Sequence, residues 1–163
     1  MTPKPEAEEQ RSIKSKIDQD IKEALKAGNN LKLGVLRMLK SEIKYKEIDK
    51  GSELSDDEVI SVLSSSVKKR KESIEQFGKG GRDDLVSREK AEVEVVMKYM
   101  PEQLTEERLS RIIHLAIQET NATGPSDLGK VMKSIMPQVK GKADGKLINH
   151  LVASHLQSLS DSS

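Results

Sequence analysis

The stretch MPQVKGKADGK, residues 136–146, holds the residues of this chain best suited to binding an anion. Asp144 is of a type that caps helices, and it precedes an apolar pattern that predicts a final helix. The N–H groups and the dipole at a helix start both favour a negative charge. Lys140, Lys142 and Lys146 would surround that start, so the stretch predicts a phosphate-binding loop.

Small residues and a preceding helix strengthen this interpretation. Gly141 and Gly145 lack side chains, so a phosphate backbone could approach them closely. Lys130 and Lys133 would extend the basic surface along the helix before the loop. The alternative is a plain solvated turn, in which glycine supplies unusual backbone angles and lysine keeps the surface wet.

Other motifs point to structure rather than to chemistry. The run KKRK at 68–71 has glutamates four residues further on, which predicts a solvated helix face. GKGGR at 78–82 lacks the ending of a nucleotide-binding loop and is interpreted as a hinge or connector. SSS at 64–66 lies in a helical pattern, where serines are usually surface or back-bonded residues. His150 and His155 are not at a metal-ligand spacing. We therefore expect no catalytic centre, metal or cofactor.

Composition narrows the classes of protein further. The 163 residues contain no cysteine, carry a formal net charge of +1 and are only 2% aromatic. The lack of cysteine favours a reducing compartment, which we take as the cytoplasm. No apolar run is long enough to span a membrane, so a soluble protein is expected. The low aromatic content argues against recognition of nucleic acid by base stacking. The first ten residues show neither a secretory signal nor a transit peptide and predict, with Arg11, a disordered tail over 1–11.

Apolar residues recur at helical spacing throughout, which predicts an all-α fold. An N-terminal multi-helix domain is expected over 12–101, with Pro101 as the boundary, and a small three-helix bundle over 102–160. Ser55 and Glu58 form a capping-box pattern. In the N-terminal domain, helices are expected over 12–28, 31–50, 55–78 and 83–100. In the C-terminal bundle, Thr105 is expected to cap the first helix and Ser126 the second, which Pro137 would break. The last helix is expected to start near Asp144.

Three segments resemble the YqeY family, a stand-alone relative of the C-terminal tail of the B subunit of glutamine-dependent tRNA amidotransferase. They are LGVLRMLKSEIKYKEID (33–49), EQFGKGGRDDLVSREKAEVEVVMKYMPEQL (75–104) and LGKVMKSIMPQVKGKADGKLINHLV (128–152). The resemblance covers nearly all of the chain from about Ser12 to Leu159. It is most specific in the last segment, where GKVM, MP, KG and ADG occur in the family's order.

The resemblance implies a helical domain joined to a small three-helix domain, and a role in holding the tRNA body while other chains carry the chemistry. Neither the amidase catalytic set nor the ATP-binding cradle is recognisable in this chain. A carbon–nitrogen ligase activity with glutamine as amido donor would therefore belong to other chains and be linked to this one only by family association. The expected function is an accessory tRNA-binding module. One alternative is a protein-interaction adaptor that docks onto an amidotransferase, an aminoacyl-tRNA synthetase or another partner. The other is an accessory subunit in glutamine-dependent carbon–nitrogen ligase activity. The implied tRNA contacts are Lys130, Lys133, Lys140, Gly141, Lys142, Gly145 and Lys146.

Overall fold

The computed structural model describes residues 11–162, and these residues form α-helices and one short 3-10 turn, with no β-strand. The all-α fold class is therefore confirmed. The chain divides into two compact units, one ending at Met100 and the other beginning at Pro101. The tail expected at 1–11 lies outside the described residues except for Arg11. Between residues 11 and 162, no helix combines the length and the apolar character needed to cross a membrane.

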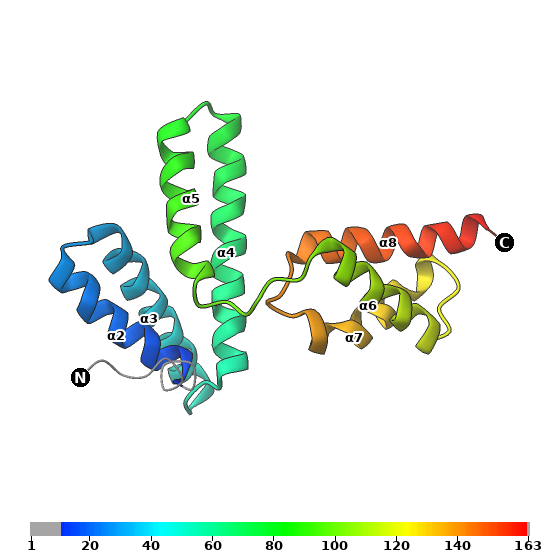
Figure 1. Cartoon of the computed structure of the whole chain (residues 1–163), viewed down its shortest axis with the longest axis horizontal. Helices are drawn as coiled ribbons and strands as arrows, with labels where there is room; N and C mark the ends of the chain where they lie inside the picture. The colour runs from blue at the N-terminus through cyan, green and yellow to red at the C-terminus, as the bar shows by residue number, and fades with distance from the viewer. Residues whose placement is uncertain (1–10, 163) are drawn as a thin grey trace. The chain divides into compact units, whose positions relative to one another are not determined.

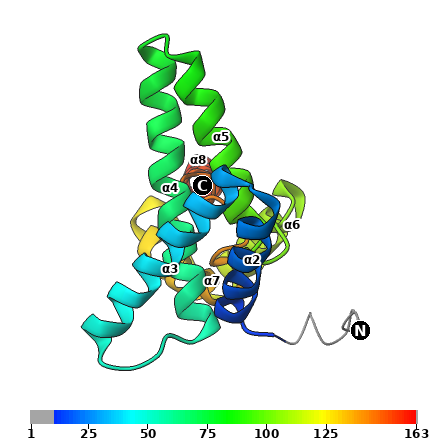
Figure 2. The same ribbon diagram turned by 90° about the vertical axis from the view of Figure 1, so that its left-hand side faces the viewer.

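The first unit begins with an antiparallel pair of helices, α2 (Ile13–Ala27) and α3 (Asn30–Lys50) (Figure 2). Each ends where the sequence places a glycine. Gly28 and Gly51 adopt left-handed backbone, with φ of 66° and 80°, which a residue without a β-carbon adopts at low cost. The turn between the helices is consequently short.

A second antiparallel pair follows, formed by α4 (Asp56–Lys79) and α5 (Asp83–Met97) (Figure 1). The capping box expected before α4 is present, because Ser55 Oγ accepts from the Glu58 N–H while the Glu58 carboxylate accepts from the Ser55 N–H. Glycines of the segment 78–82 make the turn into α5. This segment thus connects two packed helices.

The four helices enclose one apolar core and are also tied by polar contacts. The Ile13 N–H, unsatisfied within α2, donates to Asp56 Oδ1 at the start of α4 at 3.1 Å. The Tyr99 hydroxyl donates to the Asp20 carboxylate, linking the end of the unit back to α2. The buried apolar residues are Ile17, Val35, Leu36, Leu39, Ile43, Val59, Leu63, Val67, Val95 and Val96.

The run KKRK at 68–71 was expected to form a solvated helix face, and this expectation was wrong for Arg70. Its side chain is only 9% exposed and pairs through Nη1 with Glu92 and, at 3.4 Å, with Glu89, both on α5. Its Nη2 lies 3.4 Å from Met38 Sδ on α3. The reason is that α5 packs along this face of α4, and a carboxylate pair 19 and 22 residues away neutralises the guanidinium.

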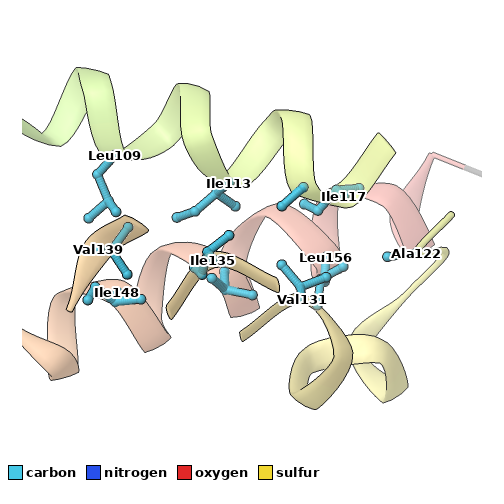
Figure 3. Packing of buried hydrophobic residues seen from close by; sticks show 11 residues of the cluster. Leu109, Ile113, Ile117, Ala122, Val131, Ile135, Val139, Ile148 and Leu156 are labelled. Atoms are coloured by element: carbon cyan, nitrogen blue, oxygen red, sulfur yellow. The ribbon is translucent and has the colours of Figure 1, made fainter. Parts of the chain in front are cut away.

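The second unit consists of α6 (Glu106–Glu119), the 3-10 turn Pro125–Asp127, α7 (Leu128–Val139) and α8 (Gly145–Asp161). Figure 3 shows side chains of α6 pointing toward those of α7 and α8. Each helix is apolar along one stripe only, so the three stripes bury one another. The core residues are Leu109, Ile113, Ala116, Ile117, Ala122, Val131, Ile135, Val139, Ile148, Val152 and Leu156.

Two expectations for α7 were wrong. Ser126 does not cap it: this residue lies within the 3-10 turn, and the residue before the helix is Asp127. Pro137 does not break it, because α7 continues to Val139. Proline removes one backbone hydrogen bond, but burial of Val139 holds the last turn and the Lys140 N–H still reaches the Met136 carbonyl at 3.0 Å.

We expect Arg70→Ala to lower the free energy of unfolding by about 3 kcal/mol, because the largely buried Glu89 and Glu92 lose the guanidinium between them and Glu92 keeps only the exposed Arg88, at 3.4 Å. Urea denaturation followed by circular dichroism measures the loss. Arg82→Ala is the matched control, since Arg82 pairs with Asp84 in solvent and an exposed pair contributes at most about 1 kcal/mol. Equal losses in the two variants would contradict this role for Arg70.

A second prediction concerns Glu47, which accepts from Lys14 Nζ at 2.5 Å and from the Leu54 N–H at 2.9 Å. The lysine contact, then the N–H, lowers the pKa of this carboxyl below its ordinary 4.5. A lowered folded-state pKa stabilises the fold above the ordinary value, and the effect disappears as pH falls through the folded-state pKa. In Glu47→Gln the melting temperature should therefore vary less with pH in the acidic range.

Thermal melts between about pH 3 and pH 6 test this. Glu53→Gln is the control, because Glu53 is 92% exposed and its carboxylate lies 3.9 Å from the same lysine. It should leave the pH profile nearly unchanged. A Glu47→Gln profile that follows the parent would overturn the assignment.

Candidate nucleic-acid interface

Helix α7 presents a basic face on the side opposite its buried residues. Val131, Ile135 and Val139 are buried, whereas Lys133 and Lys140 are exposed. Because an α-helix turns about 100° per residue, two residues seven apart point in nearly the same direction. Lys133 and Lys140 therefore lie in one row along the helix.

The exposed Lys130 begins this row one turn earlier, near the start of α7. At 1.5 Å per residue, about 15 Å of helix separates Lys130 from Lys140. The lysines of α7 consequently form a line leading to the loop, and only the last of them lies beside it. Such a line fits an extended run of phosphates better than a single anion.

The loop after α7 is a fixed turn. Gly141 has φ of 75°, a left-handed conformation that favours glycine. The Lys142 N–H donates to the Val139 carbonyl at 2.9 Å, and the Lys142 carbonyl accepts from the Leu104 N–H at 2.7 Å. Ala143 packs against the core. These contacts use the main chain and leave the lysine side chains to point elsewhere.

The residues that anchor this loop were not found from the sequence. Gln103 donates through Nε2 to the carbonyls of Gly141 and Pro101, at 2.8 Å each, and Leu104 supplies the N–H described above. Both lie almost 40 positions before the loop. A glutamine and a leucine at the end of a linker have no distinctive spacing, so no local signal indicated this pairing.

The start of α8 is already capped. Asp144 Oδ1 accepts from the Lys146 N–H at 2.8 Å, as the sequence predicts for a capping aspartate. This carboxylate stands where an external anion would otherwise contact the helix start. A bound phosphate would therefore meet the lysine side chains rather than the first N–H groups of α8, and Gly145 would contribute only open space.

The charge of the surface is strongly one-sided. From Leu128 to Leu151 the chain has five lysines and a single acidic residue, Asp144. Lys133, Lys140 and Lys142 form no ion pair with any residue in the described part of the chain. Asp127, at the start of α7, accepts from the Thr123 N–H, which lowers its pKa, and the charge of Lys130 lowers it further. The surface is thus positive along its length.

The serine triplet at 64–66 was expected to hold surface or back-bonded residues rather than a nucleophile, and two of its three serines are buried in part or in whole. Ser66 is buried in α4, and the Ser64 hydroxyl is buried without a hydrogen-bond partner among the described residues. All three histidines of the sequence belong to the second unit, and no three His, Asp or Glu residues between 11 and 162 are grouped as a metal site would need. The serines therefore belong to the packing of the first unit.

Comparison with known proteins settles the family. A family model described as "Yqey-like protein" matches residues 14–156. This chain belongs to the YqeY family. The resemblance on three segments is therefore confirmed, and the YqeY match covers both compact units.

Curated relatives of this YqeY-family chain carry the name "Altered inheritance of mitochondria protein 41, mitochondrial". The Kluyveromyces lactis protein is 33% identical over 137 residues, covering 81% of this chain and 69% of the relative. The Clavispora lusitaniae protein is 31% identical, covering 76% and 74%. The Lachancea thermotolerans protein is 39% identical over 85 residues, covering 52% and 46%, so this match spans about half of that relative.

The names of these relatives correct one expectation. The chain was assigned to the cytoplasm from its lack of cysteine and from its polar first residues, but the relatives are named as mitochondrial proteins. The cytoplasmic assignment is therefore wrong, and the relatives point to mitochondria. Absence of cysteine excludes a disulfide framework but does not distinguish one compartment from another.

Two glycines of the loop should respond differently to alanine. Gly141→Ala places a β-carbon on left-handed backbone and should cost about 1–2 kcal/mol of unfolding free energy. Gly145→Ala is the control, because it lies in the first turn of α8 and an added β-carbon meets nothing within 4 Å. Thermal denaturation of both variants measures this. Equal stability would show that the turn does not depend on the left-handed residue.

Proposed function

We propose that this YqeY-family chain is an accessory module that binds the phosphates of folded tRNA through the basic row of α7 and the loop that follows. The observation that carries the proposal is a hydrogen-bonded loop main chain beside Lys133, Lys140 and Lys142, which form no ion pair within residues 11–162. The resemblance to the amidotransferase tail supplies tRNA as the ligand.

The chemistry of the surface suits contact with phosphate rather than with bases. Lysine acts as a point charge toward phosphate oxygens, and such contacts position a protein without reading sequence. Phe77, Tyr45 and Tyr99 all lie in the first unit, so no phenylalanine, tyrosine or tryptophan ring of the second unit is available for base stacking. Recognition would depend on the shape of the RNA backbone.

A neutral chain can still bind in this way. The formal net charge of +1 gives the whole molecule little long-range attraction for nucleic acid, so the affinity must come from the local row of lysines. The relatives' mitochondrial names make mitochondrial tRNA the natural pool. Chemistry on that tRNA would be carried out by other proteins, with this chain contributing to the hold on the RNA.

Binding of purified protein to unfractionated tRNA at several salt concentrations tests the proposal. Five lysine–phosphate contacts predict that log K falls with log salt at a slope of about −4. The triple variant Lys133→Ala, Lys140→Ala, Lys142→Ala should reduce the steepness by about 2 and weaken binding at low salt.

The control removes the same charge elsewhere. Lys22→Ala, Lys26→Ala, Lys90→Ala changes three exposed lysines of α2 and α5, outside the proposed surface. It should bind like the parent. If the parent does not bind tRNA, or if both triple variants behave alike, the proposed interface is wrong. A nuclease-resistant complex with another protein would then favour the adaptor function.

A further inference from the structure

Helix α3 has a second apolar face that stays largely exposed in residues 11–162, although Met38 on this face contacts the Arg70 guanidinium through Sδ. Its buried face holds Leu36, Leu39 and Ile43. On the opposite side, Leu31, Met38, Tyr45 and Ile48 are 39%, 50%, 74% and 70% exposed. Four large apolar side chains on one exposed helix face are unusual for a chain with so few apolar residues to spare.

The spacing of these residues is that of a helix-pairing seam. Leu31, Met38 and Tyr45 recur every seven residues, and Ile48 follows Tyr45 by three. The positions that complete the same alternation of three and four are Gly34 and Ser41, both small and exposed. A repeat of this kind places its members along one face for contact with a second helix.

No contact or backbone angle within residues 11–162 requires a glycine at position 34. It lies inside α3, where glycine is less favourable than alanine, and an added β-carbon would meet nothing within 4 Å. Its backbone angle is not left-handed, so no turn requires it. A missing side chain on an exposed seam does allow another helix to approach closely.

Charges flank the seam with opposite signs. Arg37 and Lys44 lie along one edge, and Glu42 and Asp49 lie along the other. None of the four forms an ion pair with a residue in the described range 11–162. This arrangement differs from that of other charged residues on α3, such as Lys40, which pairs with Asp18 at 2.7 Å.

The pattern is complementary to itself in one orientation. When two copies of this helix run parallel and in register, the basic edge of each copy lies beside the acidic edge of the other. The residues that meet are five positions apart in the sequence. Arg37 would then face Glu42 of the second copy, and Lys44 would face Asp49. In an antiparallel pair each edge would face its own kind, so like charges would meet.

We propose that a second copy of this chain binds on this exposed face, with α3 packed parallel and in register against its equivalent. The seam of Leu31, Met38, Tyr45 and Ile48 is buried between the two helices. The two edges supply four ion pairs across the interface. A two-fold axis along α3 relates the copies, so the contact closes on itself and produces a dimer rather than a filament.

The surroundings of Tyr45 leave room for this contact. Its ring stands between two surface hollows, one lined by α2 and α3 and including Ile17 and Ile48, the other lined by α3 and α4 and including Leu54 and Val62. Neither α2 nor α4 covers the ring. Side chains of the second copy that straddle the seam can enter these hollows.

The interface is one helix face wide, which is at the small end of stable protein contacts. We therefore expect a dimer that dissociates on dilution. Sedimentation equilibrium of the full chain over a wide range of protein concentration should show a shift from 18.1 kDa toward twice this mass. Tyr45→Glu should remain at the mass of one chain, since a carboxylate would be buried at the centre of the seam.

Leu25→Glu is the matched control, because Leu25 is 59% exposed on α2 and lies outside the seam. It should dimerise like the parent. A parent that stays monomeric at every concentration overturns the proposal, and so does a Tyr45→Glu variant that dimerises normally. Circular dichroism of both variants confirms that the helices are intact, so a loss of dimer is a loss of the interface.

Charge reversal tests the orientation. Lys44→Glu and Asp49→Lys should each weaken the dimer at least tenfold, because each brings like charges together across the seam. An equal mixture of the two variants should form heterodimers, since each then offers the charge that the other lacks. If Lys44→Glu alone strengthens the dimer, or if the mixture stays monomeric, the parallel arrangement is wrong.

Discussion

Each helix in this chain has one apolar stripe to bury and an opposite face too polar to bury, and this constraint determines both compact units. In the first unit two helical hairpins bring their stripes together around residues such as Leu36 and Leu63, and in the second three shorter helices do the same around Ile135. Interiors built in this way have few places for charge. Arg70 occupies one of them, with two carboxylates of α5 as its partners. The second apolar face of α3 is an exception, since Leu31, Met38, Tyr45 and Ile48 remain largely exposed in the described residues 11–162.

In the loop between α7 and α8, residues 140–144, the main chain and the lysine side chains have different roles. Its main-chain carbonyls at Gly141 and Lys142 accept hydrogen bonds from Gln103 and Leu104, and the Asp144 side chain caps α8. The side chains of Lys140 and Lys142 take no part in these contacts. Lysine side chains on a fixed turn lose little further backbone freedom on binding, so more of the electrostatic attraction appears as affinity. A nearly neutral protein can bind phosphate only where positive charge is concentrated locally, as it is on these lysines.

Sequence reasoning succeeded where the causes were local. The capping box of Ser55 and the cap at Asp144 depend on residues within one helical turn, and the all-α class depends on apolar spacing that repeats through the chain. It failed where a distant element supplied the partner. The burial of Arg70 needs α5, the survival of the helix past Pro137 needs a packed Val139, and the anchoring of the loop needs Gln103. The basic residues of the proposed interface, and the position of Lys130 and Lys133 on the helix before the loop, could be named from the sequence, but the main-chain contacts that hold the loop followed only from the structure.

The central claim is that RNA meets this YqeY-family chain along α7 and the loop after it. Amide NMR spectra of the 18.1 kDa chain, recorded while a short RNA hairpin is added, test it most directly because they locate the contact residue by residue. The account predicts shifts at Lys133 and over residues 140–146, with the amides of α2 and α5 unchanged and the shifts reversed by added salt. Shifts confined to the first unit, or none at RNA concentrations that saturate binding in a filter assay, would contradict it.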